Sequence, residues 1–211
     1  MKLREQIEQL VDGKPYRHAL FYNFPGGLRL RMSEGGDYFG RVLTALGKAT
    51  AVCEDVFAGA DTMVVHLQRY ATPKRFDLRF ALKQLDLAGI TIPRARDIWA
   101  ELVPRDEPDD DDNWWLHLVF ELPRSQLQNL LWCAFACDVR ELRPNPHCLV
   151  YLINPELGLI VHPYDDRGMD VIGKNGSALK HLYTVHQTLL LEYDLDAMHQ
   201  TFAAGAAGPA H

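Results

Sequence analysis

One helical pattern constrains the fold of this chain more than any other sequence feature, and it covers residues 38–57. The apolar side chains recur at the three- and four-residue spacing of one helix face. Asp37 stands before the pattern as an N-cap, and Gly59 ends it. A helix with one apolar face needs a complementary apolar surface to cover. The residues of this face are Phe39, Val42, Leu43, Leu46, Ala49, Cys53, Val56 and Phe57.

Short strands separated by turn residues provide such a surface. Residues 61–68 alternate between apolar and polar side chains, as a half-buried strand does, with Met63, Val65 and Leu67 on one side. Hairpins followed by covering helices favour an α+β fold with an antiparallel-rich sheet over a doubly wound parallel one. Further strands are predicted at 19–22, 28–32, 97–103, 114–121, 148–153 and 157–162, and further helices at 3–11, 76–87, 125–139 and 177–191, the last capped by Ser177.

The domain organisation follows from length and element order. A chain of 211 residues is long enough for one domain or two small ones. The order strand, strand, helix, strand occurs over 19–68 and again over 97–153, so two similar halves remain open. We expect one compact domain over 1–211, with sub-units 1–72 and 73–202 as the alternative. The Ala-, Gly- and Pro-rich residues 203–211 are expected to form a flexible tail.

The net charge of the chain is concentrated in one segment. Residues 106–112 hold six acidic and no basic residues, and the formal net charge of the whole chain is −6. The rest of the chain is therefore neutral overall. It lacks the excess of Lys and Arg with which proteins displace counterions from phosphates. We expect no nucleic-acid partner.

The sequence also indicates where the protein resides. It contains no run of about 18 apolar residues, so we expect no membrane span. Residues 1–6 are charged and lack the apolar core of a signal peptide, which predicts a cytosolic protein. The cysteines are then expected to be free core residues rather than disulfides. Zinc binding by Cys133, Cys137, His147 and Cys148 is the less favoured alternative, and we expect no metal and no cofactor.

The most unusual motif is Tyr-Asp-Asp-Arg-Gly at residues 164–168, with Asp170 two positions later. It has two interpretations. As a turn, it would pair Arg167 with a carboxylate and place Gly168 at positive φ. As a site, the cluster Asp165, Asp166 and Asp170 would bind a divalent cation or act as acid and base, with Tyr164 or His162 assisting. The turn is favoured, and no catalytic residue is assigned.

This motif resembles the hallmark of an uncharacterised bacterial family with a C-terminal domain of unknown function. The residues Leu-Phe-Tyr-Asn-Phe at 20–24, followed by Leu-Arg-Leu at 28–30, are similar to the N-terminal signature of that family. The family commonly has an aromatic and then an acidic residue after Arg29, where this chain has Leu30 and Arg31. The resemblance implies a bacterial cytosolic protein and brings no established reaction.

An acidic segment beside a pair of tryptophans is typical of a protein-binding surface. Clustered carboxylates attract a basic partner, and large aromatic side chains anchor it. We therefore predict a binding protein rather than an enzyme, of the immunity type that neutralises a cognate toxin. Two alternatives stay open: a solvated loop without a partner, and a metal-dependent hydrolase or transferase using the Asp165, Asp166 and Asp170 cluster. The expected contact residues are Asp109, Asp110, Asp111, Asp112, Trp114 and Trp115.

Overall fold

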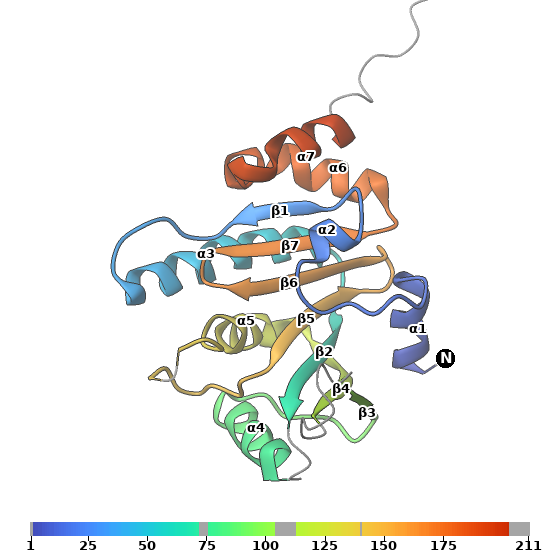
Figure 1. The fold of residues 1–211 in the computed structure, drawn as a ribbon, viewed down its shortest axis with the longest axis vertical. Coiled ribbons are helices and arrows are strands. Elements are labelled where there is room, and N and C mark those ends of the chain that lie inside the picture. The colour runs from blue at the N-terminus through green and yellow to red at the C-terminus, as the bar shows by residue number, and fades with distance from the viewer. Residues whose placement is uncertain (1, 72–75, 104–112, 140, 203–211) are drawn as a thin grey trace, which may run out of the picture.

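A seven-stranded sheet forms the centre of the molecule (Figure 1). The computed structural model describes residues 2–71, 76–103, 113–139 and 141–202. Every pair of neighbouring strands is antiparallel, which confirms the predicted α+β fold with an antiparallel sheet. The strand order is β1-β7-β6-β5-β2-β4-β3. The strands are β1 (Leu28–Arg31), β2 (Thr62–Ala71), β3 (Arg96–Leu102), β4 (Trp114–Pro123), β5 (Leu149–Asn154), β6 (Leu159–Asp165) and β7 (Gly168–Gly173).

Five helices contribute to the larger of two apolar cores, on one face of the sheet. Alternate strand residues such as Val65, Phe120 and Leu152 project into this core and are fully buried. In the helix Leu127–Phe135, the buried apolar side chains include Leu127, Leu130, Leu131, Ala134 and Phe135. The helices are α3 (Tyr38–Val56), α4 (Phe76–Leu87), α5 (Leu127–Phe135), α6 (Gly176–Val185) and α7 (Leu195–Phe202).

The opposite face of the sheet is covered by the N-terminal part of the chain. The helices α1 (Leu3–Leu10) and α2 (Leu20–Asn23) pack here with the segment that joins them. The apolar core on this face is smaller. It includes Ile7 and Val11 from the N-terminal part and Val64, Val119 and Ile160 from the strands. None of the described helices combines the length and apolarity needed to cross a bilayer.

The longest predicted helix is present, and its cap is the predicted one. Asp37 Oδ1 accepts a hydrogen bond from the backbone nitrogen of Gly40 at 2.9 Å. The predicted stripe is wrong at its beginning, because Phe39 and Leu43 are 58% and 48% exposed. The first turns of α3 extend past the ends of the strands (Figure 1), so no sheet surface lies beneath them.

Three predicted elements differ in the structure. Residues 19–22 form the start of α2 instead of a strand, after Ala19 turns the chain with a φ of 55°. The first of the two predicted strand-strand-helix-strand halves therefore does not form. The α6 helix is capped by Asn175, whose Oδ1 accepts from Ala178 N at 3.0 Å, and not by Ser177. The expected flexible tail, residues 203–211, lies outside the described residues.

The two ends of α3 differ in what they contribute to stability. Replacing the fully buried Phe57 with Ala removes a side chain from the larger core, and we expect the free energy of unfolding to fall by about 3–5 kcal/mol. Replacing the exposed Phe39 with Ala serves as the matched control and should change it by about 0.5 kcal/mol or less. Urea denaturation measures both values, and equal losses would contradict this assignment of the helix ends.

Candidate functional site

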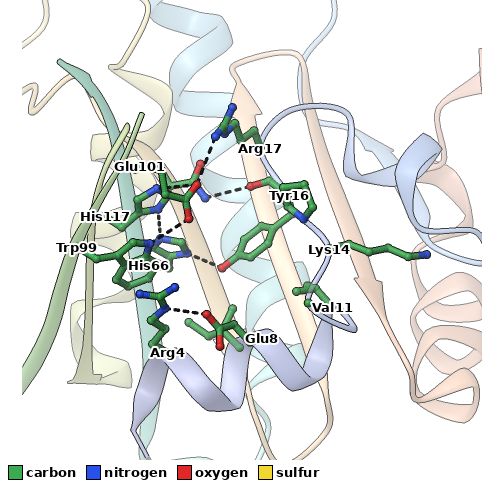
Figure 2. Close-up of a pocket in the computed structure, with 14 residues that line it drawn as sticks. Arg4, Glu8, Val11, Lys14, Tyr16, Arg17, His66, Trp99, Glu101 and His117 are labelled. Atoms are coloured by element: carbon green, nitrogen blue, oxygen red, sulfur yellow. Dashed lines mark hydrogen bonds and ion pairs between the residues drawn. The ribbon is translucent and has the colours of Figure 1, made fainter. Parts of the chain in front are cut away.

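A cavity of about 210 Å³ lies between α1, the following segment and the strands β2, β4 and β3. Figure 2 shows side chains from all of these elements converging on it. Strand alternation places His66, His117 and Glu101 on the face that α1 covers. The cavity therefore combines side chains from the N-terminal helix and from three strands that come later in the sequence.

A chain of hydrogen bonds forms the inner wall of the cavity. The Tyr16 hydroxyl is bonded to His66 Nδ1, and His66 Nε2 lies 3.0 Å from His117 Nδ1. His117 Nε2 then faces Glu101 Oε2 at 3.5 Å, too long for a well-formed hydrogen bond. All three ring-bearing residues of this chain are buried.

The ionised Glu101 fixes the direction of these bonds. A carboxylate facing His117 Nε2 requires that nitrogen to carry its proton, because two acceptors would repel each other. His117 Nδ1 then accepts from His66 Nε2–H, and His66 Nδ1 accepts from the Tyr16 hydroxyl. Every proton in the chain thus points toward Glu101.

Aromatic stacking holds the outer wall in place. The rings of Trp99 and His117 stack with their centroids 4.6 Å apart and an interplanar angle of 2°. Trp99 Nε1 donates to Glu101 Oε1 at 3.1 Å, and the Arg4 guanidinium lies 4.6 Å above the Trp99 ring. Arg17 approaches Glu101 Oε2 at 3.4 Å. The mouth of the cavity therefore carries both cationic and anionic groups.

Burial shifts the titration of this wall. Desolvation lowers the pKa of His66 well below its ordinary value, and the neighbouring His117 adds to the effect. Desolvation also lowers the pKa of His117 to about 4, although Glu101 opposes it. For Glu101, desolvation raises the pKa, but the Trp99 hydrogen bond and the electrostatic interactions with His117 and Arg17 outweigh it and lower the pKa. Both imidazoles are neutral at pH 7, and Glu101 is ionised.

Polar residues continue across the same face to the far end of the sheet. Tyr151 stacks on His162 at 4.3 Å, and its hydroxyl donates to the backbone oxygen of Arg17 at 2.5 Å. His162 lies opposite Asp170 in the β6–β7 register. Burial lowers the pKa of His162 to about 4 and raises the pKa of Asp170 to about 6. These groups are not among the residues that line the 210 Å³ cavity, and they pack within the face of the sheet.

The Tyr-Asp-Asp-Arg-Gly motif is the turn between β6 and β7. Asp165 Oδ1 accepts from the backbone nitrogens of Arg167 and Gly168 at 2.8 and 3.2 Å. The predicted pairing of Arg167 is present, since its Nη2 lies 2.5 Å from Asp165 Oδ2. The predicted positive φ of Gly168 is wrong. Gly168 is required for space, because a Cβ there would lie 1.8 Å from the Tyr164 Oη.

The three aspartates of the motif do not converge. Asp166 binds Arg41 Nε at 3.1 Å, whereas Asp170 Oδ2 accepts from Phe21 N at 3.1 Å. Tyr164 Oη accepts from Arg29 Nε at 3.2 Å. Among the residues that the structure describes, no group of three or more His, Cys, Asp or Glu side chains is placed to hold a metal ion. The four cysteines are free, and all but Cys137 are buried.

The predicted contact residues are only partly described. Asp109–Asp112 lie outside the described residues. Trp114 and Trp115 are both half-buried and point to opposite faces of β4. Trp115 packs against Tyr70 with centroids 5.4 Å apart, and the Arg17 guanidinium lies 5.1 Å from its ring. Trp115 thus lies beside the cavity, in contact with Arg17, which lines it.

The main residues of the cavity, Tyr16, His66, Glu101 and His117, were missed because they share no sequence motif. They lie on a loop and three strands, and hydrogen bonds join them only in the fold. The one available signal was a histidine at a strand position flanked by apolar residues, as His66 and His117 are. Such positions are buried, and a buried histidine needs hydrogen-bond partners from other elements.

The close approach at the turn predicts a steric coupling between two motif residues. Replacing Gly168 with Ala forces its Cβ into the Tyr164 ring, and we expect a loss of about 2 kcal/mol or more in the free energy of unfolding. In a Tyr164→Ala background the same change should cost much less, because the ring is absent. Gly47→Ala, in open space on α3, is the control and should stabilise by up to about 1 kcal/mol. Equal costs in both backgrounds would contradict the coupling.

The neutral histidines predict a dependence of stability on pH. His66, His117 and His162 bind protons less readily in the folded than in the unfolded chain, whose histidines titrate near 6.5. The free energy of unfolding should therefore fall as the pH decreases from about 6.5 to 4. Asp170, with its pKa raised to about 6, opposes this fall between pH 6 and 4.

Two substitutions test whether the cavity wall contributes to this pH dependence of the free energy of unfolding. His117→Gln should make the fall shallower over pH 6.5 to 4, because one depressed histidine is removed. His181→Gln, at an exposed position on α6, should leave the slope unchanged. Urea denaturation at several pH values measures the slopes. Identical slopes for wild type and His117→Gln would show that His117 does not titrate abnormally.

Comparisons with known proteins identify a family over most of the chain. The model of the domain of unknown function DUF3885 matches residues 3–194, which include the cavity, the motif and Arg29. No curated protein and no solved structure matches the chain. Because the family model spans far more than half of the sequence, this protein belongs to the DUF3885 family.

Proposed function

We propose that this chain is a binding protein whose partner is a basic protein. It would act as an immunity-type protein that neutralises a cognate toxin in the bacterial cytoplasm. The observation that carries the proposal is the outer edge of β3, which pairs with no other strand in the described part of the chain. An unpaired edge offers backbone N–H and C=O groups to an added strand.

The two edges of the sheet differ in how they are protected. At the β1 edge, Leu30 forms a bridge with Leu190, and Leu191 N donates to Arg29 O at 2.9 Å. At the β3 edge, the apolar side chains of Ile98 and Leu102 are 53% and 49% exposed. Natural edge strands usually carry charges or a cover against unwanted pairing. The strand β3 also carries the charged residues Arg96, Asp97 and Glu101, but Ile98 and Leu102 leave exposed apolar side chains along its edge, which favours a contact surface.

An apolar groove extends this edge toward α4. Its lining includes Ile98 and Leu116 from the hairpin and Leu82 from the helix, which is 36% exposed. A partner strand added to β3 would place alternate side chains against this groove. This groove is small, with a volume of about 30 Å³, so it adds a limited apolar contact to the exposed Ile98 and Leu102.

The charge of the neighbouring sequence indicates the nature of the partner. Val103 N donates to Asn113 O at 2.9 Å at the end of the β3–β4 hairpin. This bond fixes the two residues between which the chain carries the acidic segment 106–112. Six carboxylates tethered at this point attract a basic protein and accelerate its association. They also repel acidic proteins and nucleic acids.

The alternative function, a metal-dependent hydrolase or transferase, has no observation in its favour. Asp165, Asp166 and Asp170 are each held by different partners and face different directions in the hairpin. Asp165 satisfies the backbone of its own turn, as a structural aspartate does.

Affinity capture with the full chain tests the proposal. We expect wild-type protein to retain one basic protein from the extract of the source cells. Ile98→Lys, which places a charge on the open edge, should weaken that complex at least tenfold. Tyr193→Lys is the matched control, since Tyr193 is 87% exposed away from this edge, and it should bind as wild type does.

Kinetics and toxicity distinguish the outcomes. Replacing Asp109–Asp112 with Ser should slow association and weaken its dependence on salt. Expression of the captured protein should harm a test host, and co-expression of wild type but not of Ile98→Lys should relieve the harm. Capture that is indifferent to Ile98, or that is insensitive to salt, would overturn the proposal.

A further inference from the structure

The cavity beneath α1 remains unused by a partner that binds the β3 edge. At about 210 Å³ it is smaller than the roughly 300–1,000 Å³ of sites for drug-sized ligands. It is nevertheless far larger than one water molecule, which occupies about 30 Å³ in the liquid. Its size suits a small metabolite.

Charges of both signs line this cavity. Arg4 and Glu8 of α1 form an ion pair at 2.7 Å, and Arg17 approaches Glu101 at 3.4 Å. The side chains are 44%, 50%, 31% and 43% exposed in that order, so neither pair is sealed by the protein. Exposed ion pairs are weak and exchange partners readily. Lys14 also lines the cavity, but its side chain points away from the centre (Figure 2).

The inner wall adds an unpaired donor and an apolar surface. His117 Nε2 carries a proton and has no hydrogen-bond partner of good geometry, although the residue is only 4% exposed. A buried polar atom left without a partner is uncommon and costs free energy. Ile7 and Val11 supply apolar side chains on the side of α1.

We propose that this cavity binds a small free α-amino acid through its carboxylate and ammonium groups. Arg17 and Arg4 are the receptors for the carboxylate, because guanidinium groups match its geometry. Glu101, ionised at neutral pH, is the receptor for the ammonium group. The side chain of the ligand lies against Ile7 and Val11, which selects for a small apolar residue. This proposal is independent of the protein contact at β3.

The balance of charges favours a zwitterion over a simple ion. A carboxylic acid without an amine would engage the two guanidiniums and displace Glu8 and Glu101 from their partners. An amine without a carboxylate would engage the carboxylates of Glu8 and Glu101 and leave Arg4 and Arg17 without ion-pair partners. A zwitterion supplies a carboxylate to the guanidiniums and an ammonium group to Glu101, so only Glu8, whose side chain is 50% exposed to solvent, loses its ion-pair partner.

Isothermal titration calorimetry of the full chain with defined probes tests this. The probes are glycine, L-alanine, L-valine, L-leucine and L-phenylalanine, and, for the tightest binder, its N-acetyl and its amide derivatives. We expect at least one free amino acid to bind with a dissociation constant below 1 mM. Each derivative, having lost one charge, should bind at least tenfold more weakly.

Two variants locate the ligand. Glu101→Gln and Arg17→Gln should each weaken binding at least tenfold, whereas Glu54→Gln on α3, an exposed position on the other face of the sheet, should not. The indole N–H resonance of Trp99, which reports the hydrogen bond to Glu101, should shift on binding. Its assignment comes from Trp99→Phe. Unfolding curves of each variant confirm that it is folded.

Each remaining outcome overturns the proposal. Equal binding of the N-acetyl derivative would make the ligand a simple acid, and equal binding of the amide would make it an amine. A free amino acid that binds without shifting Trp99, or that binds Glu101→Gln as tightly as wild type, occupies another place. Failure of every probe below 10 mM would show that the cavity holds only solvent.

Discussion

The structure depends on how one polar face of a sheet is covered. The face of the sheet that packs against α3–α7 is apolar. The opposite face also carries buried polar residues: His66, Gln68, His117, Tyr151 and Asp170. Buried polar groups are tolerated only when they are hydrogen-bonded. The N-terminal part of the chain supplies such bonds to His66, Gln68, Tyr151 and Asp170. Without it these polar groups would be exposed to water, and the apolar residues between them would lose their cover.

The covering segment bonds the sheet largely through its backbone. Gln68 Nε2 donates to Tyr16 O at 3.0 Å, Tyr151 Oη donates to Arg17 O at 2.5 Å, and Phe21 N donates to Asp170 at 3.1 Å. Backbone groups impose position but little side-chain identity. The segment between α1 and α2 therefore traces an irregular path with Ala19 at positive φ, because its course is set by the partners on the sheet. The cavity lies between residues 13–17 of this segment and the strands β2, β3 and β4.

The sequence pattern correctly predicted those elements whose structure depends on neighbouring residues alone. The Asp37 cap, the helix Leu127–Phe135 and the alternation of β2 each follow from residues within one element. Residues 19–22 were mistaken for a strand, because Asp170, 149 positions away from Phe21, accepts a backbone N–H of α2. Gly168 was correctly expected at a turn but for the wrong reason, since a ring from the preceding strand excludes a Cβ. The cavity was beyond prediction for a related reason: its groups come from α1, the segment after it and three strands.

The long-range bonds of the N-terminal segment impose an order on folding during synthesis. Residues 3–24 leave the ribosome before the strands that they bond, since their partners include Gln68, Tyr151 and Asp170. Contacts so distant in sequence form late, because the loops that they close are long. Until the ribosome has delivered β7, the amphipathic α1 has an incomplete surface to cover, and the polar face stays open to water. The segment 3–24 therefore acquires its final place only after β7 has been made.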